Sequence, residues 1–164
     1  MKKIDWENLS FGYQKTDYNV RCYYRDGKWG EIEVSSDENI NIHMAATCLH
    51  YGQEAFEGLK AYRCPDGKVR VFRPEENAAR LQRTCRGIVM PEPPTELFVE
   101  MIKKVVRLNQ EYIPTYESGA TLYLRPLLIG TGAQVGVRPA EEYLLLIFAT
   151  PVGPYFKVGF STNP

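Results

Sequence analysis

The feature that most constrains the fold is an unbroken apolar run near the end of the chain, from Tyr143 to Thr150. A strand with one wet face alternates apolar and polar residues, whereas a short run that is apolar throughout favours a strand covered on both faces. A second strand is predicted from Thr121 to Arg125, leading into Pro126–Gly130. These two strands predict a sheet with a buried centre.

Two β-hairpins are predicted earlier in the chain. Val20–Val34 reads as two β-runs around Asp26-Gly27, and Asp-Gly supplies the positive φ that a tight hairpin needs. Leu59–Arg63 and Val69–Arg73 flank a second turn, in which Asp66-Gly67 repeats the same chemistry. Both segments therefore add antiparallel strands to the sheet.

Two main helices are predicted between the hairpins and the last strands. The first runs from Arg73 to about Arg86, with Gly87 as its stop, because Pro74 and two acidic residues suit a helix start. The second has Thr95 as its N-cap and ends before Pro114. Its apolar face consists of Leu97, Phe98, Met101, Ile102, Val105, Leu108 and Tyr112.

A further short helix, ended by Gly58, would place Tyr51 and Phe56 on one face. Strands and helices are segregated along the sequence, which is typical of an α+β domain with an antiparallel sheet and two main helices.

The composition excludes several classes of protein. The chain has 164 residues, enough for one domain, and 20 Lys+Arg balance 20 Asp+Glu, so no basic surface for nucleic acid or an anionic membrane is predicted. The first residues lack the apolar core of a signal peptide, and no run approaches the roughly 20 apolar residues of a membrane span. We therefore expect a soluble, cytoplasmic protein.

The cysteines and histidines suggest no metal site and no disulfide framework. The four cysteines are widely separated without a Cys-x-x-Cys pair, so we expect reduced thiols. His43 and His50 do not have the spacing that binds a metal on one helix. The glycine-rich stretch Gly130–Val137 is not followed by a helix pattern, so a surface loop is predicted in place of a phosphate-binding loop.

Two arrangements could carry chemistry, and spacing alone leaves both open. Arg80 lies one helical turn after Glu76, which suits either a surface ion pair or a phosphate-binding guanidinium. Tyr123 and Arg125 are two apart in a strand, so their side chains leave the same face. That face could bind a carboxylate, or the strand could be an edge strand with Arg125 in water.

Taken together, these segments resemble the branched-chain amino acid aminotransferases, which are fold-type IV pyridoxal 5'-phosphate enzymes, and in particular their small N-terminal domain. The resemblance covers most of the chain from Phe11 onward. It rests on Leu49-His50-Tyr51, Phe56-Glu57-Gly58-Leu59-Lys60-Ala61-Tyr62-Arg63, Val71-Phe72-Arg73-Pro74 with Asn77 and Arg80, Leu122-Tyr123-Leu124-Arg125-Pro126, Ile129-Gly130, Gly136-Val137 and Pro151-Val152-Gly153-Pro154-Tyr155-Phe156.

The resemblance implies a role for each matching residue. Arg80 would bind the cofactor phosphate, while Tyr123 and Arg125 would face the substrate, with Arg125 available to the side-chain carboxylate of glutamate or 2-oxoglutarate. Val137 would reach the neighbouring subunit's site in a homodimer. The apolar wall that accepts leucine, isoleucine or valine would consist of Phe11, Tyr51, Phe56 and Tyr155.

The chain departs from the family in one respect that matters for the reaction. Transamination in this family needs a lysine that binds the cofactor covalently, in a Gly-Gly-Asn-Tyr context after the interdomain connection. No such segment occurs here, and Lys60 and Lys157 do not take its place. We therefore expect residues 1–150 to form the small domain and 151–164 to be the connection and the start of a missing catalytic domain. The chain alone should be inactive.

Two alternatives remain. The chain could be a stand-alone, non-catalytic binding or dimerisation module, or it could derive from a D-amino acid transaminase or an aminodeoxychorismate lyase, which share the fold. Separation from a catalytic domain would leave an apolar patch exposed near Phe56, Tyr123 and Tyr155.

Overall fold

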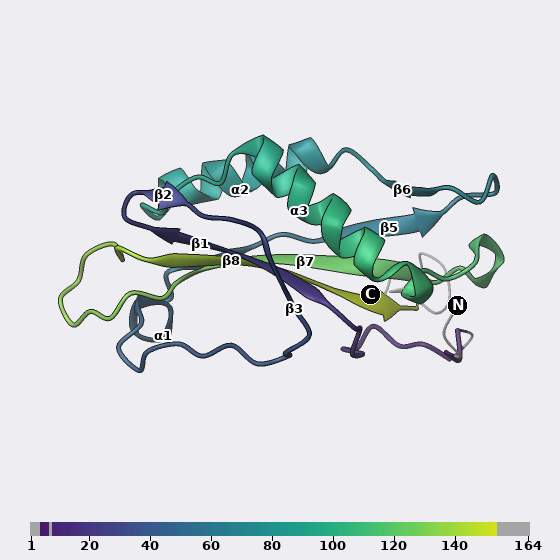
Figure 1. The fold of residues 1–164 in the computed structure, drawn as a ribbon, viewed down its shortest axis with the longest axis horizontal. Helices are drawn as coiled ribbons and strands as arrows, with labels where there is room; N and C mark the ends of the chain where they lie inside the picture. The colour runs from purple at the N-terminus through teal and green to yellow at the C-terminus, as the bar shows by residue number, and fades with distance from the viewer. Residues whose placement is uncertain (1–3, 7, 154–164) are drawn as a thin grey trace, which may run out of the picture.

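A computed structural model describes residues 4–6 and 8–153. The strands form one antiparallel sheet in the order β2-β1-β8-β7-β5-β6 (Figure 1). At its centre, β7 (Thr121–Gly130) and β8 (Tyr143–Val152) pair along their full lengths. The apolar run thus forms a central strand, and all of its residues except Phe148 are buried, which confirms burial on both faces. The strand runs two residues past the predicted end, because Pro151 and Val152 pair with the start of β7.

The outer strands join the two central ones. β1 (Asn19–Arg25) pairs with β8, and its other edge pairs with β2 (Lys28–Trp29) and β3 (Glu33–Ser35). β4 (Glu54–Phe56) and β5 (Leu59–Arg63) both pair with β7, and β6 (Val69–Val71) pairs with β5. Both predicted hairpins are confirmed, and Asp26, Gly27 and Gly67 have φ values of 51°, 75° and 76° at the two turns.

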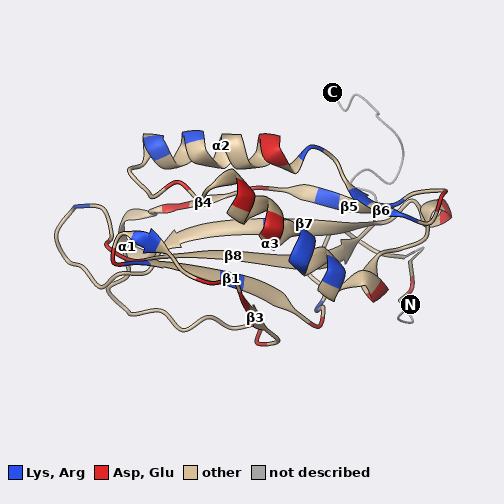
Figure 2. Cartoon of the chain, turned by 45° about the horizontal axis from the view of Figure 1, so that its top comes forward, with Lys and Arg blue, Asp and Glu red and all other residues tan. Residues whose placement is uncertain are grey.

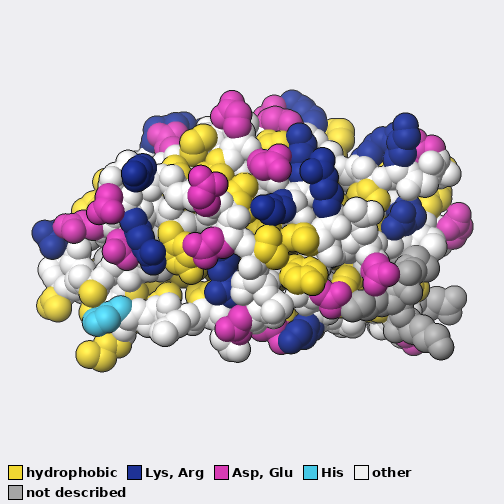
Figure 3. All heavy atoms as spheres, in the orientation of Figure 1, with side chains coloured by type: hydrophobic (Ala, Val, Ile, Leu, Met, Phe, Trp, Pro, Cys, Tyr) yellow, Lys and Arg dark blue, Asp and Glu magenta, His cyan; other side chains and the backbone are white. Residues whose placement is uncertain are grey.

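Two main helices lie on one side of the sheet (Figure 1). α2 (Pro74–Gly87) begins and ends as predicted. α3 (Thr95–Leu108) packs against α2, β8 and β1. Its buried residues are Phe98, Met101, Ile102, Val105 and Val106. Acidic and basic residues both occur along α2 and α3 (Figure 2), and side chains of both signs are mixed over this face of the molecule (Figure 3), in keeping with the balanced composition.

The boundaries of α3 differ from the prediction. Thr95 is the first helical residue and does not cap the helix, since Pro94 occupies the N-cap. The helix ends at Leu108 because Asn109 Nδ2 donates to the carbonyl oxygens of Val105 and Tyr18, both at 2.9 Å, which ties the helix end to the segment before β1. Two 3₁₀ turns follow, η1 (Gln110–Tyr112) and η2 (Tyr116–Ser118).

The predicted short helix ending at Gly58 is wrong. α1 (Thr47–Tyr51) ends at Gly52, whose φ of 59° turns the chain into β4. The buried side chain of Gln53 holds this turn, because its Oε1 accepts from Thr47 Oγ1 at 2.9 Å and from the amide of Ala140 at 3.1 Å. Tyr51 and Phe56 therefore lie in different elements and share no helix face.

The central strands present different residues to their two faces. Leu122, Leu124 and Leu128 of β7 belong to the buried core that also contains the helix residues. Tyr123 and Arg125 point to the opposite face, which we call the open face, and are half-buried there. Since β7 lies between β8 and the strands β4 and β5, the alternative that Arg125 belongs to an edge strand is wrong.

The four cysteines are free thiols, as predicted. Within the described residues, no helix is long and apolar enough to cross a membrane.

Candidate functional site

Four of the predicted residues meet on the open face. Arg125 Nε donates to Tyr123 Oη at 3.1 Å, and the guanidinium carbon lies 4.5 Å from the ring centroid of Phe56 and 5.3 Å from that of Tyr123. The ring of Phe11 meets Tyr123 edge-on, with centroids 5.3 Å apart. We call Phe11, Phe56, Tyr123 and Arg125 the Arg125 cluster.

Backbone register explains why these residues meet. Tyr123 and Arg125 are two apart in β7, so they share a face as predicted. Phe56 pairs with Leu127 across β4 and β7, so its side chain leaves the same face beside Arg125. The N-terminal segment is fastened along β8, where the Gln14 amide donates to Thr150 Oγ1 at 2.8 Å, and this brings Phe11 over Tyr123.

Three members of the Arg125 cluster, Phe11, Tyr123 and Arg125, line a pocket of about 180 Å³, and Phe56 is not among its lining residues. Its lining residues are Phe11, Gly12, Tyr13, Tyr123, Arg125, Phe148, Thr150 and Val152. Within the described part of the chain, the Arg125 guanidinium contacts two aromatic side chains, Tyr123 and Phe56, but pairs with no carboxylate. A cation with aromatic walls and no anionic partner can accept a carboxylate, while the walls accept an aliphatic chain.

Arg80 is held by a residue that the sequence reasoning did not connect with it. Its Nε and Nη2 donate to Glu57 Oε1 at 2.8 Å and Oε2 at 2.6 Å. The ion pair with Glu76 that the spacing suggested is absent, because Glu76 pairs with Arg73. Glu57 raises the pKa of Arg80 through these hydrogen bonds and its negative charge, so the guanidinium stays protonated.

The segment Phe56-Glu57-Gly58 connects Arg80 to the Arg125 cluster. Phe56 lies under the Arg125 guanidinium, and Glu57 binds Arg80. A Cβ added to Gly58 would lie 2.5 Å from Tyr123 Oη, so the absence of a side chain there makes room for the phenol. The motif quoted for the resemblance therefore has a structural meaning at each of its first three positions.

Tyr51 and Val137 lie apart from this group. The Tyr51 hydroxyl donates to the carbonyl oxygen of Val135, in the loop that follows β7. That loop begins after Gly130, seven residues from Tyr123 along the strand, which corresponds to about 23 Å. Val137 is 87% exposed at this end of the molecule. Tyr155 lies outside the described residues.

The glycine-rich loop is a surface loop, as predicted, but its base is fixed. Gln134 is buried, and its Nε2 donates to the carbonyl oxygens of Gly136 at 2.9 Å and Arg138 at 2.6 Å. Val135 and Val137 are consequently held outward from an ordered support.

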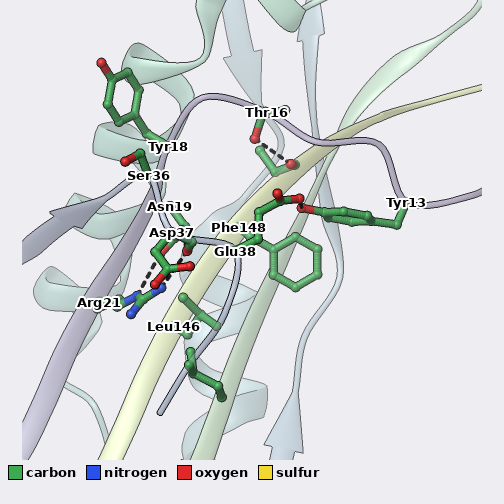
Figure 4. Close-up of a pocket in the computed structure, with 12 residues that line it drawn as sticks. Tyr13, Thr16, Tyr18, Asn19, Arg21, Ser36, Asp37, Glu38, Leu146 and Phe148 are labelled. Carbon is green, nitrogen blue, oxygen red and sulfur yellow. Dashed lines mark hydrogen bonds between the residues drawn. The ribbon is translucent and has the colours of Figure 1, made fainter.

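A second pocket of about 180 Å³ lies beside β1, between the N-terminal segment and residues 36–40 (Figure 4). Of its two carboxylates, Glu38 accepts from the Tyr13 hydroxyl at 2.7 Å and pairs with Lys15 Nζ at 2.6 Å, and Asp37 Oδ1 accepts from the Asn39 amide at 2.9 Å. The Arg21 guanidinium in this pocket donates to the backbone carbonyl oxygens of Asp37 at 2.7 Å and Asn39 at 3.0 Å. Burial, together with the hydrogen bond to Glu38, raises the pKa of Tyr13 to about 12. The charged groups of this pocket are therefore already engaged with one another or with the backbone, so it offers less to a charged ligand than the Arg125 cluster does.

The expected apolar exposure is present in part. Phe56 is 62% exposed, whereas Tyr123 is half-buried beneath Phe11. The sequence reasoning missed Glu57 as the partner of Arg80, and Asn77 as a second donor to the Glu57 carboxylate. An available signal was the acidic residue inside an otherwise strand-like stretch, because a buried carboxylate requires a partner.

Curated proteins are similar to this chain over nearly its whole length. No protein-family model matches the chain. The chain is 53% identical over 163 residues to a branched-chain-amino-acid aminotransferase of Haemophilus influenzae, covering 99% of this chain and 48% of that protein. A Helicobacter pylori protein of the same name is 46% identical over 159 residues, covering 97% of this chain and 47% of the relative. The chain thus spans about half the length of these curated relatives.

Solved structures agree with the sequence comparison. A crystal structure of an Escherichia coli branched-chain amino acid aminotransferase superposes with a TM-score of 0.62 at 25% identity, covering 86% of this chain and 41% of that one. A branched-chain aminotransferase from Thermoproteus uzoniensis has the same fold, with a TM-score of 0.65 at 24% identity, covering 85% of this chain and 43% of that one. By sequence and by fold, the chain is homologous to the branched-chain-amino-acid aminotransferases, and its α+β fold is that of their small N-terminal domain.

Proposed function

We propose that this chain is the substrate-binding domain of a pyridoxal phosphate-dependent transaminase that moves the amino group of leucine, isoleucine or valine to 2-oxoglutarate. The observation that carries the proposal is the Arg125 cluster, a guanidinium with aromatic walls and no carboxylate partner among the described residues. One pocket must accept an aliphatic side chain in one half of the reaction and an acidic one in the other. Aromatic walls suit the first, and Arg125 suits the second.

Each member of the cluster has a distinct part in this proposal. Arg125 binds the distal carboxylate of 2-oxoglutarate or glutamate. Tyr123 Oη accepts from Arg125 Nε and so holds the guanidinium in place when the substrate is aliphatic and brings no anion. Phe11 lines the pocket, contacts the aliphatic side chain and excludes water. Phe56 packs against the Arg125 guanidinium and is assigned to the apolar wall on the resemblance. Tyr51, Val137 and Tyr155 are assigned to the apolar wall and the subunit contact on the resemblance alone.

The residues present fit the phosphate of the cofactor. The Arg80 side chain is 60% exposed although one of its edges binds the buried Glu57, so its other N–H groups remain available to an anion. Arg80 would hold the phosphate, and the cofactor would supply the electron sink for the amino transfer. This chain's own residues bind and orient the substrate.

The chain is proposed to lack the catalytic lysine and to depend on a further domain. Residues 1–150 would be the small domain, and 151–164 would lead into the domain that carries the lysine. Support comes from the share of the relatives that the chain covers, 48% and 47% for the two bacterial proteins. The chain as given is expected to have no transaminase activity.

The proposal also includes a cytoplasmic homodimer. The support for the dimer is Val137, an apolar side chain that is 87% exposed on a loop whose base Gln134 fixes. Sedimentation of the longer protein should give a dimer that Val137→Asp weakens. Cell fractionation tests the location, since the plant relatives are named as chloroplastic.

The test compares this chain with the longer protein proposed to contain it. Only the longer protein should transfer amino groups from L-leucine, L-isoleucine and L-valine to 2-oxoglutarate, and the 164-residue chain treated with pyridoxal phosphate and borohydride should show no stoichiometric lysine adduct. Turnover by the short chain would refute the missing-lysine argument. Faster reaction with D-amino acids would favour the D-amino acid transaminase alternative.

A variant tests the assignment of Arg125 within the longer protein. Arg125→Leu should lower kcat/KM for 2-oxoglutarate by about 10- to 100-fold, the value of one charge-assisted hydrogen-bonded pair, and affect branched-chain 2-oxo acids much less. Arg107→Leu is the matched control, because Arg107 is an exposed arginine on α3, away from the Arg125 cluster. An equal loss for both substrate classes would contradict the assignment.

A further inference from the structure

A buried acid stands behind the proposed phosphate-binding arginine. The Glu57 side chain is 3% exposed and that of Arg80 is 60% exposed, so the carboxylate lies inside the protein and the guanidinium projects outward from it. We propose that Glu57 is a positioning residue, which orients the Arg80 guanidinium so that one edge faces the cofactor phosphate. This inference rests on the proposed function.

The donor count of the guanidinium supports the inference. Arginine has five N–H groups in one plane. Glu57 accepts from Nε at 2.8 Å and from Nη2 at 2.6 Å, which occupies the Nε edge. Both N–H groups of Nη1 and one of Nη2 remain, and one N–H from each of these two nitrogens forms the edge that can bind two phosphate oxygens side by side. Binding to Glu57 therefore selects which edge is presented.

The carboxylate is itself fixed, so it can fix the arginine. The Glu57 amide donates to the Pro126 carbonyl oxygen at 2.9 Å, which fastens its backbone to β7. Asn77 Nδ2 donates to Glu57 Oε2 at 2.9 Å from α2, one turn before Arg80. A long arginine side chain loses much rotamer freedom when it binds, and a rigid partner removes part of that cost in advance.

Electrostatics and orientation predict opposite changes in phosphate affinity when Glu57 is neutralised, which makes the inference testable. Glu57 is negative and lies next to the guanidinium, so simple Coulomb repulsion says that neutralising it should tighten phosphate binding. If Glu57 orients Arg80, neutralising Glu57 should weaken phosphate binding, because Arg80 then loses a charge-assisted partner and samples other rotamers. The sign of the change distinguishes the two effects.

The experiment uses the longer protein, freed of cofactor and titrated with pyridoxal phosphate or with pyridoxal, which lacks the phosphate. Glu57→Gln keeps the size of the side chain and removes its charge. We expect this change to raise the Kd for pyridoxal phosphate by about tenfold and to leave that for pyridoxal unchanged, since an unrestrained arginine must give up its rotamer freedom when it binds the phosphate. Glu54→Gln is the matched control, because Glu54 is an exposed acid on the neighbouring strand β4.

The pattern of changes in Kd decides whether Glu57 positions Arg80. Weakening confined to pyridoxal phosphate supports the inference. Unchanged or tighter binding overturns it, and so does equal weakening of both ligands, which indicates a merely structural role. Thermal unfolding of each variant shows whether the fold persists. In an Arg80→Gln background, Glu57→Gln should have no further effect, and a persisting effect overturns the inference.

Arg80→Gln alone separates this inference from the proposed function. If it leaves the affinity for pyridoxal phosphate unchanged, Arg80 does not bind the phosphate, and both proposals about the cofactor fail. If it weakens binding while Glu57→Gln does not, the phosphate site stands and only the role of Glu57 is refuted.

Discussion

Gly58 makes room for the Tyr123 phenol, and a single methyl group there should disturb the Arg125 cluster. An alanine Cβ at this position would lie 2.5 Å from Tyr123 Oη and 3.2 Å from its ring carbon Cζ. Gly58 does not have a positive φ, so the backbone accepts alanine and the cost arises from the contact alone. Overpacking of this kind costs about 1–3 kcal/mol of stability. The tyrosine ring must shift, and its hydroxyl then leaves Arg125 Nε.

A double-mutant cycle tests this reasoning by urea unfolding of the chain. Tyr123→Phe removes the oxygen responsible for the 2.5 Å contact, so Gly58→Ala should cost about 1 kcal/mol less in that background than in the original chain. Gly87→Ala is the control, because nothing lies within 4 Å of the added Cβ in α2, and it should be neutral or stabilise by about 0.5–1 kcal/mol. An equal cost of Gly58→Ala in both backgrounds would refute the contact as the cause.

Three further changes have defined outcomes. Gln53→Leu should destabilise the chain by about 2 kcal/mol or more in urea, because it removes the acceptor for the Thr47 hydroxyl and the Ala140 amide; a loss below about 0.5 kcal/mol would contradict this account. Burial raises the pKa of Cys85 to about 11, so a thiol reagent at pH 8 should modify the half-buried Cys64 before Cys85; faster modification of Cys85 would contradict its burial. Hydrogen bonds from Arg70 and the Lys68 amide lower the pKa of Asp66 to about 2. The Asp66 carboxylate therefore contributes its full stabilisation above the ordinary pKa of an aspartate, about 4, and this stabilisation is lost as the pH falls through about 2. Asp66→Asn should therefore lower the unfolding midpoint clearly at pH 7 and much less at pH 2, and an equal difference at both pH values would refute the ion pair.

The sequence predicted the sheet and the main helices because their signals are local. The apolar run of β8, the Asp-Gly turns and the Pro74 start of α2 each act within a few residues, and each is confirmed. The helix expected up to Gly58 failed for a tertiary reason. Pairing of Glu54–Phe56 with β7 outweighs the local helix propensity of this segment. The sequence of the segment itself does not indicate which strand it pairs with.

The sequence predicted which residues belong to the candidate site but not which side chains pair within it. Two-residue spacing was enough to put Tyr123 and Arg125 on one face, and the structure bears this out. The partner of Arg80 was not accessible, because Glu57 is 23 residues away while Glu76 has the ideal helical spacing. Spacing within a helix indicates which side chains could meet, whereas tertiary packing decides which of them do.

The opposite facing of alternate residues in β7 has a consequence for misfolding. Even-numbered residues such as Leu122 and Leu124 fill the core, and odd-numbered ones such as Tyr123 and Arg125 form the cluster. A slip of one residue would expose the leucines and bury the guanidinium among apolar side chains. A wrongly registered sheet would therefore be much less stable than the native one, so the same alternation that builds the Arg125 cluster also selects the correct pairing of β7.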